Sequence, residues 1–532
     1  MSRINSIAIF SVLLFASSVQ AGETLSASAA DRLGLEIAWE RNLQVPTGSQ
    51  SIVHQELYVH NEAPLEYVEI VGASAQNPNA KQKVLFRLLT SRLGKDGKPI
   101  GKVEAQRLAR NEIRRLKRRS INGTITTRIV PRVNLYSLGD DGTIECRNAE
   151  TGEPIWMQRI GDRRLGYSKF GVNDRYISLI NGANLIQLDV KNGEEIRAVR
   201  TNGAPLFGAV NSGRFALIPT IRNGVEGYSL DDIRDQPFHE IVEGHALSAP
   251  VKAPGTTRVG WGTSEGFVYV MELQGRPGVL FRLDVDGNVG GRLATSAGSR
   301  FFFGSDRGQV YCVRATRVGK VIWSKPYGEP FFNDPMVVGE QLLLRSGYGN
   351  LYSLGLADGV STWQNTSPGV GELLAAFDGK IFVRSLSGNM AVLDLKTGEP
   401  IQSLRDILPN KLLVNSQSDR LYLVTTQGSV QCVRPAGAAI PTFNKTSEAP
   451  EMSKKMGETE AGPAMFDKPS MADPFDAKSA DPFAPAGGGD PFGADPGADP
   501  FGGGGAGAGA DPFGGGGADA GASPFGDDPF GN

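Results

Sequence analysis

Short apolar runs alternate with glycine-containing turns along most of the chain. The stretch RFFFGSDRGQVYCVR, from Arg300 to Arg314, shows the pattern, with one run on each side of a turn glycine. Short runs rich in β-branched and aromatic residues and bounded by turn residues are typical of strands, and two runs joined across a turn predict a hairpin. We therefore expect the chain between residues 34 and 435 to consist mainly of antiparallel strands.

The turn glycines recur at a spacing of about 40 residues, which is the sign of a repeat architecture. In the fuller units a Trp-containing run follows the hairpin, and a run entered through proline precedes it, which makes four strands. Four short antiparallel strands per repeat form the blade of a β-propeller. The pattern predicts an all-β fold, an eight-bladed β-propeller of four-stranded blades, with one blade for each of Gly142, Gly182, Gly224, Gly266, Gly308, Gly349, Gly388 and Gly428.

The last repeat ends before its outer strand, because Ala, Gly and Pro follow SVQCVRP at Ser429 to Pro435. Near the N-terminus, GLEIAWERNL from Gly34 to Leu43 has the pattern of an outer strand that lacks the rest of its blade. Pairing of these two segments would close the ring and cover a strand edge that otherwise invites aggregation. We predict that the propeller, residues 22–435, is closed by this N-terminal strand.

An insertion at about residues 62–123 interrupts the repeats. It contains the strand-like LEYVEIV and a segment in which Ala105, Leu108, Ala109, Ile113 and Leu116 recur at helical spacing. Two interpretations stay open: a helix docked on the propeller with a solvated charged face, or a docking site for an anionic partner such as an acidic peptide, a polysaccharide or lipid headgroups. The candidate binding residues are Arg110, Arg114, Arg115 and Arg118.

From Ala436 onward the composition shifts to Gly, Ala, Pro and Asp, with too little apolar surface to offset chain entropy, so residues 436–532 are expected to be a disordered tail. Asp-Pro-Phe recurs within it. The tail is either drifting low-complexity sequence or a multivalent ligand whose weak contacts gain avidity on one chain. Such repeats bind adaptor domains in eukaryotic endocytosis, but an exported tail would lie on the wrong side of the membrane. The candidate contact residues are Phe475, Phe483, Phe492, Phe501, Phe513 and Phe530.

Charge and targeting signals limit the classes of partner and the cellular location that we expect. Pro435 onward holds fifteen acidic and five basic side chains, which leaves the preceding part with an excess of eight basic groups. This mild excess argues against a nucleic-acid binder. Residues 1–21 read as a signal peptide, with a basic Arg3, an apolar core too short to span a bilayer and a small-x-small pattern ending at Ala21. No Cys follows for lipid anchoring, so we expect a periplasmic or secreted protein without a transmembrane segment.

The outer turns carry a family resemblance. NAETGEPIW at Asn148 to Trp156 and LDLKTGEPI at Leu393 to Ile401 resemble the PQQ-like, quinoprotein-type propeller repeat, and the resemblance covers roughly Gly34 to Pro435. The arrangement is also similar to the BamB-type propellers of outer-membrane protein assembly, which have eight such blades and no enzymatic activity. The resemblance therefore implies a propeller fold and, through the BamB type, envelope or periplasmic protein partners.

Quinoprotein dehydrogenases hold their quinone between a Trp and a disulfide of two adjacent cysteines, beside a calcium ion. The three cysteines here, Cys146, Cys312 and Cys432, lie far apart and each follows a turn glycine by four residues. We interpret them as small buried packing residues, and Trp156, Trp323 and Trp363 as packing between neighbouring blades. No bound cofactor is expected.

Other chemistry has little support in the sequence. The four histidines lack the company of a zinc site, and there is no nucleophile elbow or phosphate-binding loop. DVDGN at Asp284 to Asn288 imitates a calcium loop, but the later ligand positions differ, so a tight turn is expected. The sequence favours a non-enzymatic scaffold for protein-protein interaction at the cell envelope, with a PQQ-dependent dehydrogenase or a carbohydrate-binding propeller as alternatives.

Overall fold

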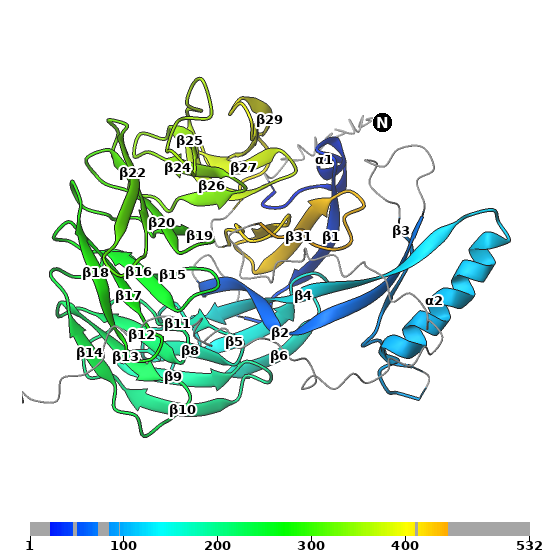
Figure 1. Cartoon of the computed structure of the whole chain (residues 1–532), viewed down its shortest axis with the longest axis horizontal. Coiled ribbons are helices and arrows are strands. Elements are labelled where there is room, and N and C mark those ends of the chain that lie inside the picture. The colour runs from blue at the N-terminus through cyan, green and yellow to red at the C-terminus, as the bar shows by residue number, and fades with distance from the viewer. Residues whose placement is uncertain (1–21, 46–50, 73–83, 95, 410–412, 445–532) are drawn as a thin grey trace, which may run out of the picture. The chain divides into compact units, whose positions relative to one another are not determined.

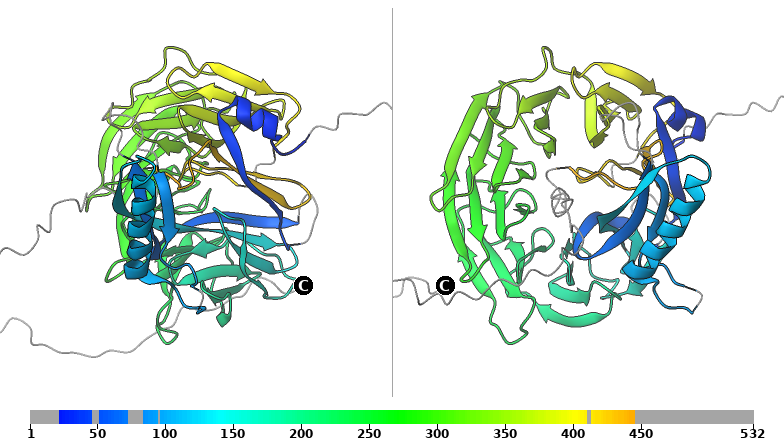
Figure 2. Two further views of the ribbon diagram at one scale, coloured as in Figure 1. Left: turned by 90° about the vertical axis from the view of Figure 1, so that its right-hand side faces the viewer. Right: turned by 45° about the vertical axis from the view of Figure 1, so that its right-hand side comes forward.

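The computed structural model describes residues 22–45, 51–72, 84–94, 96–409 and 413–444. The predicted signal peptide and the Asp-Pro-Phe segment lie outside these ranges. In the described part the strands form eight sheets, and every strand pair is antiparallel. The chain is thus an all-β propeller, in which the sheets follow one another around a ring (Figure 2).

Five of these sheets contain four strands that follow each other in sequence order. The first three are β7 (Gly171–Val172), β8 (Tyr176–Asn181), β9 (Asn184–Asp189) and β10 (Glu195–Arg200); β11 (Val210–Ser212), β12 (Phe215–Thr220), β13 (Gly224–Ser229) and β14 (Phe238–Ile241); and β15 (Val251–Lys252), β16 (Arg258–Gly262), β17 (Phe267–Glu272) and β18 (Gly278–Asp284). The other two are β19 (Ala294–Ser296), β20 (Arg300–Gly304), β21 (Gln309–Arg314) and β22 (Lys320–Pro326); and β26 (Val370–Phe377), β27 (Lys380–Ser385), β28 (Met390–Asp394) and β29 (Pro400–Leu404).

The other three sheets depart from four strands, so the prediction of four in every blade is wrong for them. One has three strands, β23 (Met336–Val338), β24 (Gln341–Arg345) and β25 (Leu351–Gly355). The Trp-containing run VSTWQNT at residues 360–366, expected as the outer strand, forms a single isolated bridge, between Ser361 and Leu354. Local hydrogen bonds compete with the ladder there, since the Ser361 hydroxyl donates to the Trp363 carbonyl at 2.8 Å. The remaining two sheets contain the chain closure and the insertion.

The closing sheet confirms the predicted pairing of the N-terminal strand with the last repeat. It contains β30 (Leu421–Val424), β31 (Ser429–Pro435) and, outermost, β1 (Leu35–Asn42). Trp39 of β1 lies opposite Cys432 of β31. Two sheets built from continuous chain have the same pairing, Trp156 with Cys146 and Trp323 with Cys312. The N-terminal strand therefore takes the position that an outer strand takes elsewhere, and all three cysteines are buried as predicted.

Neighbouring sheets are locked together by tryptophans, as predicted. The indole Nε1 of Trp156 donates to the Val190 carbonyl at 3.0 Å, and that of Trp39 donates to the Ala149 carbonyl at 2.9 Å. Trp323 and Trp363 make the same bond to Leu356 and Leu395, both at 3.1 Å. Apolar clusters also join adjacent sheets, so the core lies between the sheets all around the ring. Contact between Trp39 and the five-stranded sheet described below closes that ring.

A short helix precedes the closing strand. Helix α1 (Ala27–Arg32) begins at Ser26, whose hydroxyl accepts a hydrogen bond from the Ala29 N–H at 3.2 Å. Ala29 and Ala30 are buried in one apolar cluster with residues of the closing sheet and of the sheet before it. The described chain also continues past the predicted boundary at 435, because the Ala436 N–H donates to the Gly34 carbonyl and the Thr442 N–H to Asp419.

The insertion is built into the remaining, five-stranded sheet, in the order β3-β2-β4-β5-β6. The proximal halves of two long strands form the inner strands of this sheet, and their distal halves continue outward as an arm (Figure 1). We name the arm as residues 61–72, 84–94 and 96–131. Its elements and their sheet partners are β2 (Ile52–Gly72), β3 (Val84–Leu89), α2 (Gly101–Lys117), β4 (Gly123–Gly139), β5 (Thr143–Asn148) and β6 (Pro154–Arg159).

Candidate functional site

The arm begins at a polar cluster that ties it to the neighbouring sheet. The β2–β4 ladder is irregular between His60 and Leu65, where the arm leaves the ring. There the Asn61 N–H donates to Asp174 Oδ1 at 2.9 Å, and His60 Nε2 lies 3.0 Å from the Tyr136 hydroxyl. Burial opposes ionisation of Asp174, but hydrogen bonds from His60 and the backbone lower its pKa. The base of the arm is therefore held by hydrogen bonds to the sheet β7–β10.

Helix α2 packs on the arm's own sheet, which corrects the expectation that it would dock on the propeller. Ala105 and Ala109 are fully buried against Val68 and Ile70 of β2 and Leu88 of β3. The small alanines let the helix approach the sheet closely, and the predicted residues Leu108, Ile113 and Leu116 flank them. The helical spacing seen in the sequence thus correctly identified the buried face. The partner of that face is β2, β3 and β4.

The opposite side of α2 carries a line of exposed side chains that we call the outer stripe: Val103, Arg107, Arg110, Arg114 and Arg118. Their spacing of three or four residues places them on one face. At a rise of about 1.5 Å per residue the outer stripe is about 22 Å long. Three of the four predicted arginines, Arg110, Arg114 and Arg118, are therefore aligned by the fold.

Charge on the outer stripe is only partly neutralised. Arg107 forms a bidentate pair with Glu104, at 2.7 and 2.6 Å, and this pair lowers the pKa of the Glu104 carboxyl. Arg115, the fourth predicted residue, lies beside the outer stripe with Nη1 3.7 Å from Glu112. In the described ranges no ion pair involves Arg110, Arg114 or Arg118. These three guanidinium groups are free to bind carboxylates or phosphates, which match the planar geometry of arginine.

Sequence reasoning missed Val103, which is 83% exposed at one end of the outer stripe. The signal that could have found it is its position, four residues before Arg107 and on the side opposite Ala105 and Ala109. The predicted tail residues Phe475, Phe483, Phe492, Phe501, Phe513 and Phe530 lie outside the described residues. Their role stays a prediction.

A cavity of about 530 Å³ lies among the inner strands of the ring. Its lining mixes charges of both signs, including Glu56, Lys169 and Arg292. His54 contacts Phe170 edge to face at 4.7 Å and lies 3.7 Å from Glu56, and its pKa is lowered because burial disfavours the cation. The lining contains four basic and three acidic side chains, so its charge is nearly balanced and does not select a charged ligand.

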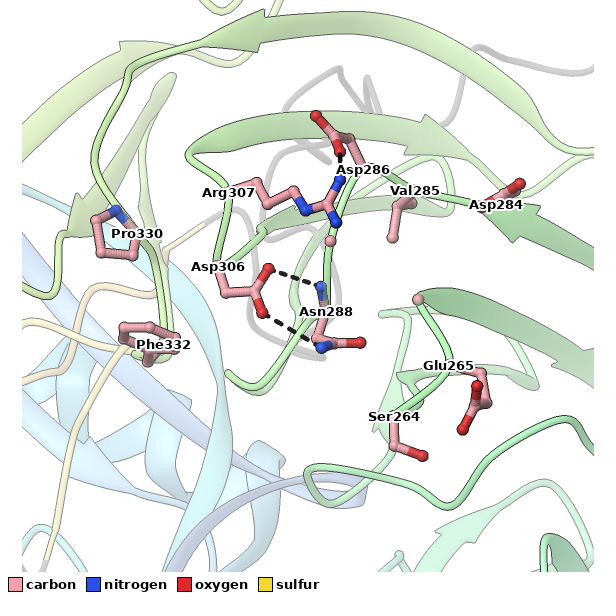
Figure 3. Close-up of a pocket in the computed structure, with 12 residues that line it drawn as sticks. Ser264, Glu265, Asp284, Val285, Asp286, Asn288, Asp306, Arg307, Pro330 and Phe332 are labelled. Atoms are coloured by element: carbon pink, nitrogen blue, oxygen red, sulfur yellow. Dashed lines mark hydrogen bonds and ion pairs between the residues drawn. The ribbon is translucent and has the colours of Figure 1, made fainter.

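A wider depression of about 1100 Å³ lies among the turns of the sheets β15–β18 and β19–β22 (Figure 3). It contains the Asp-rich turn that imitates a calcium loop. Asp306 accepts hydrogen bonds from the Asn288 N–H at 2.8 Å and from Asn288 Nδ2 at 3.3 Å, and Asp286 pairs with Arg307 at 3.0 Å. Gly287 has a φ of +89°, which a tight turn requires. The carboxylates of Asp286 and Asp306 thus hold the turn in place.

Two kinds of feature are absent from the described part of the chain. No group of three or more His, Cys, Asp or Glu side chains is placed there to hold a metal ion. No helix there is long and apolar enough to cross a membrane.

Part of the chain is similar to a known protein family. Residues 258–450 match the profile of a family described as outer membrane protein assembly factor BamB. No curated protein sequence matches the chain. Among solved structures, BamB from Moraxella catarrhalis is 14% identical over 57% of this chain and 93% of its own, with a TM-score of 0.45. The computationally designed Ika8 protein is 13% identical over 56% and 92%, with a TM-score of 0.46. Residues 258–450 are thus similar to the BamB family.

Proposed function

We propose that this chain is a non-enzymatic scaffold of the cell envelope, in which the arm binds an acidic surface of a partner protein, as would suit a role in outer-membrane protein assembly. The observation that carries the proposal is the outer stripe, where three exposed arginines that have no acidic partner among the described residues lie on a helix held away from the ring. Holding exposed guanidinium groups in line on a rigid element prepares a surface for carboxylates at little cost in ordering. The BamB-like profile match supports the choice of a protein partner.

The test is affinity capture from an envelope fraction with the full chain carrying Arg110→Glu, Arg114→Glu and Arg118→Glu. We expect partners that the unmodified chain retains at low salt to be lost. The matched control reverses Arg200, Arg276 and Arg317, which are exposed on three other sheets and give the same change in net charge. Retention of the same partners by the outer-stripe variant would contradict the proposal, and loss in both variants would mean that net charge alone governs capture.

Two alternatives have their own assays. A quinone-dependent dehydrogenase predicts dye reduction after addition of PQQ and calcium, and we expect no turnover. A carbohydrate-binding propeller predicts glycan-array binding by the unmodified chain, whereas a lipid-binding arm predicts sedimentation with anionic vesicles. Either result would replace the acidic protein surface with another partner class.

A further inference from the structure

Along the arm, no strand of the described part of the chain pairs with the outer edge of β4. β4 pairs with β2 along nearly its whole length, but it pairs with β5 only from Asn134 to Leu138. Residues 124–130 consequently have a strand on one side alone. In the described residues no backbone hydrogen bond leaves this segment on the other side. Because neighbouring residues of an antiparallel ladder direct their N–H and C=O groups alternately to the two sides, the segment presents a row of unpaired donors and acceptors.

Within residues 124–130 this edge lacks the prolines and bulges that usually protect one, although Pro131 directly follows the segment. Its sequence, TITTRIV, is β-branched at every position except Arg128, which favours an extended conformation. The pairing from Leu65 with Val130 to Gly72 with Gly123 contains no bulge. Thr124, Thr126 and Thr127 are exposed, and Ile129 is 51% exposed. Natural sheets block open edges with several charges, prolines or bulges, and here Arg128 is the one charge within the segment.

We propose that residues 124–130 bind an extended, acidic segment of a partner protein as an added β-strand. The inference deepens the proposed function, because it takes the arm as the binding element and names the form of the bound segment. Main-chain hydrogen bonds supply affinity in this mode, and side chains on alternate positions supply selectivity. The edge is about 24 Å long at about 3.4 Å per residue, close to the length of the outer stripe.

The positive charge of the arm indicates which kind of strand binds at residues 124–130. The stretch from Gly101 to Arg119 contains eight basic and two acidic side chains, so the arm favours a negatively charged strand. A second copy of this chain is a worse occupant. Antiparallel pairing of two identical edges would place both α2 helices on the same face of the joined sheet, where their like charges repel. An acidic strand from another protein meets no such repulsion.

The first experiment adds a capped seven-residue peptide, in which Glu alternates with Thr and Val, to the full chain. Hydrogen exchange followed by mass spectrometry reports on the backbone, and fluorescence anisotropy reports on affinity. We expect slower exchange within residues 124–130. A peptide with Lys in place of Glu should bind at least about tenfold more weakly, and so should an acidic peptide methylated at alternate backbone nitrogens.

Two protein variants test the same edge from the other side. Thr126 and Thr127 direct their N–H groups to opposite sides of β4, so proline at one of them removes an outward donor and spares the pairing with β2. The variant of the two that keeps the unmodified urea midpoint should lose the peptide. If both unfold, the methylated peptide still decides the question.

Equal binding of the methylated peptide, protection confined to α2, or no binding would overturn the inference. The proposed function fails on a different readout, the capture of envelope partners after reversal of the outer stripe, so the two failures are distinguishable.

Discussion

Replacing Gly152 with alanine is expected to weaken the junction that closes the ring. Gly152 lies in the turn between β5 and β6 with a φ of +70°. A Cβ atom there would lie 2.5 Å from Cε3 of Trp39. The turn cannot easily withdraw, because its carbonyl accepts a hydrogen bond from the buried Arg147 at 3.0 Å. The indole cannot easily withdraw either, since Trp39 is 6% exposed and bonded to the Ala149 carbonyl. The added methyl group must therefore displace one of them.

Three contributions set the size of the effect. Alanine in the left-handed region costs about 1 kcal/mol more than glycine. Overpacking of a well-filled contact costs about 1 to 3 kcal/mol. Loss of the indole hydrogen bond adds about 1 kcal/mol. We expect the free energy of unfolding to fall by about 3 to 5 kcal/mol.

The matched control is Gly255→Ala. Gly255 has a φ of +67°, and a Cβ atom there would contact nothing within 4 Å, so only the backbone contribution of about 1 kcal/mol remains. Urea unfolding followed by circular dichroism measures both variants. With a denaturant slope of about 3 kcal/mol per molar, the midpoint of Gly152→Ala should fall below that of the control by about 1 M. Equal midpoints would show that Trp39 does not pack against this turn, and the account of ring closure would be refuted.

Two further predictions concern buried groups. Arg420 is fully buried between Glu150, at 2.9 Å, and Asp419, at 2.8 Å, so Arg420→Met should cost about 3 to 5 kcal/mol near pH 8 in a urea titration. Burial raises the pKa of Glu150, and Arg420 opposes this increase. Without the arginine, Glu150 binds a proton more readily in the folded state, so the loss of unfolding free energy should shrink towards pH 5. A loss that does not depend on pH would contradict this reasoning. Cys146 and Cys312, whose pKa burial raises to about 12, should resist iodoacetamide near pH 8 until the protein is unfolded, and adducts on the native protein in mass spectrometry would disprove their burial.

Local patterns predicted the hairpins and the closure because the relevant signals are short-range. A turn glycine such as Gly142 has a φ of +84°, and a strand buried on both faces, such as β20 with its three phenylalanines, contains consecutive apolar residues, so both features are visible in a few letters. The unfinished last repeat and the isolated strand around Trp39 complemented each other in the repeat pattern. The outer run after β25 failed this logic, since the Ser361 and Thr362 hydroxyls donate to the backbone carbonyls of Trp363 and Ser353 and compete with the ladder.

The candidate site was predicted only in part. The periodicity of α2 separated Ala105 and Ala109 from the arginines, and that separation is correct. It could not show that Glu104 neutralises Arg107 while Arg114 has no ion-pair partner in the described part of the chain, because ion pairing depends on side-chain reach. The strand before the insertion was not assigned from the sequence, and its place in the sheet follows from the pairing of Ile52 to His60 with β4.

The sequence by itself determined the repeated strands, the propeller class, the amphipathic helix and the pairing of the two chain ends, because each follows from local spacing and from a repeat that must be completed. Only the tertiary structure decided that β2 and β4 continue past the ring as one ladder, that α2 packs on them, and that residues 124–130 keep an open edge. A strand's sequence sets its preference for an extended conformation, whereas its neighbours are set by contacts between residues far apart in the chain.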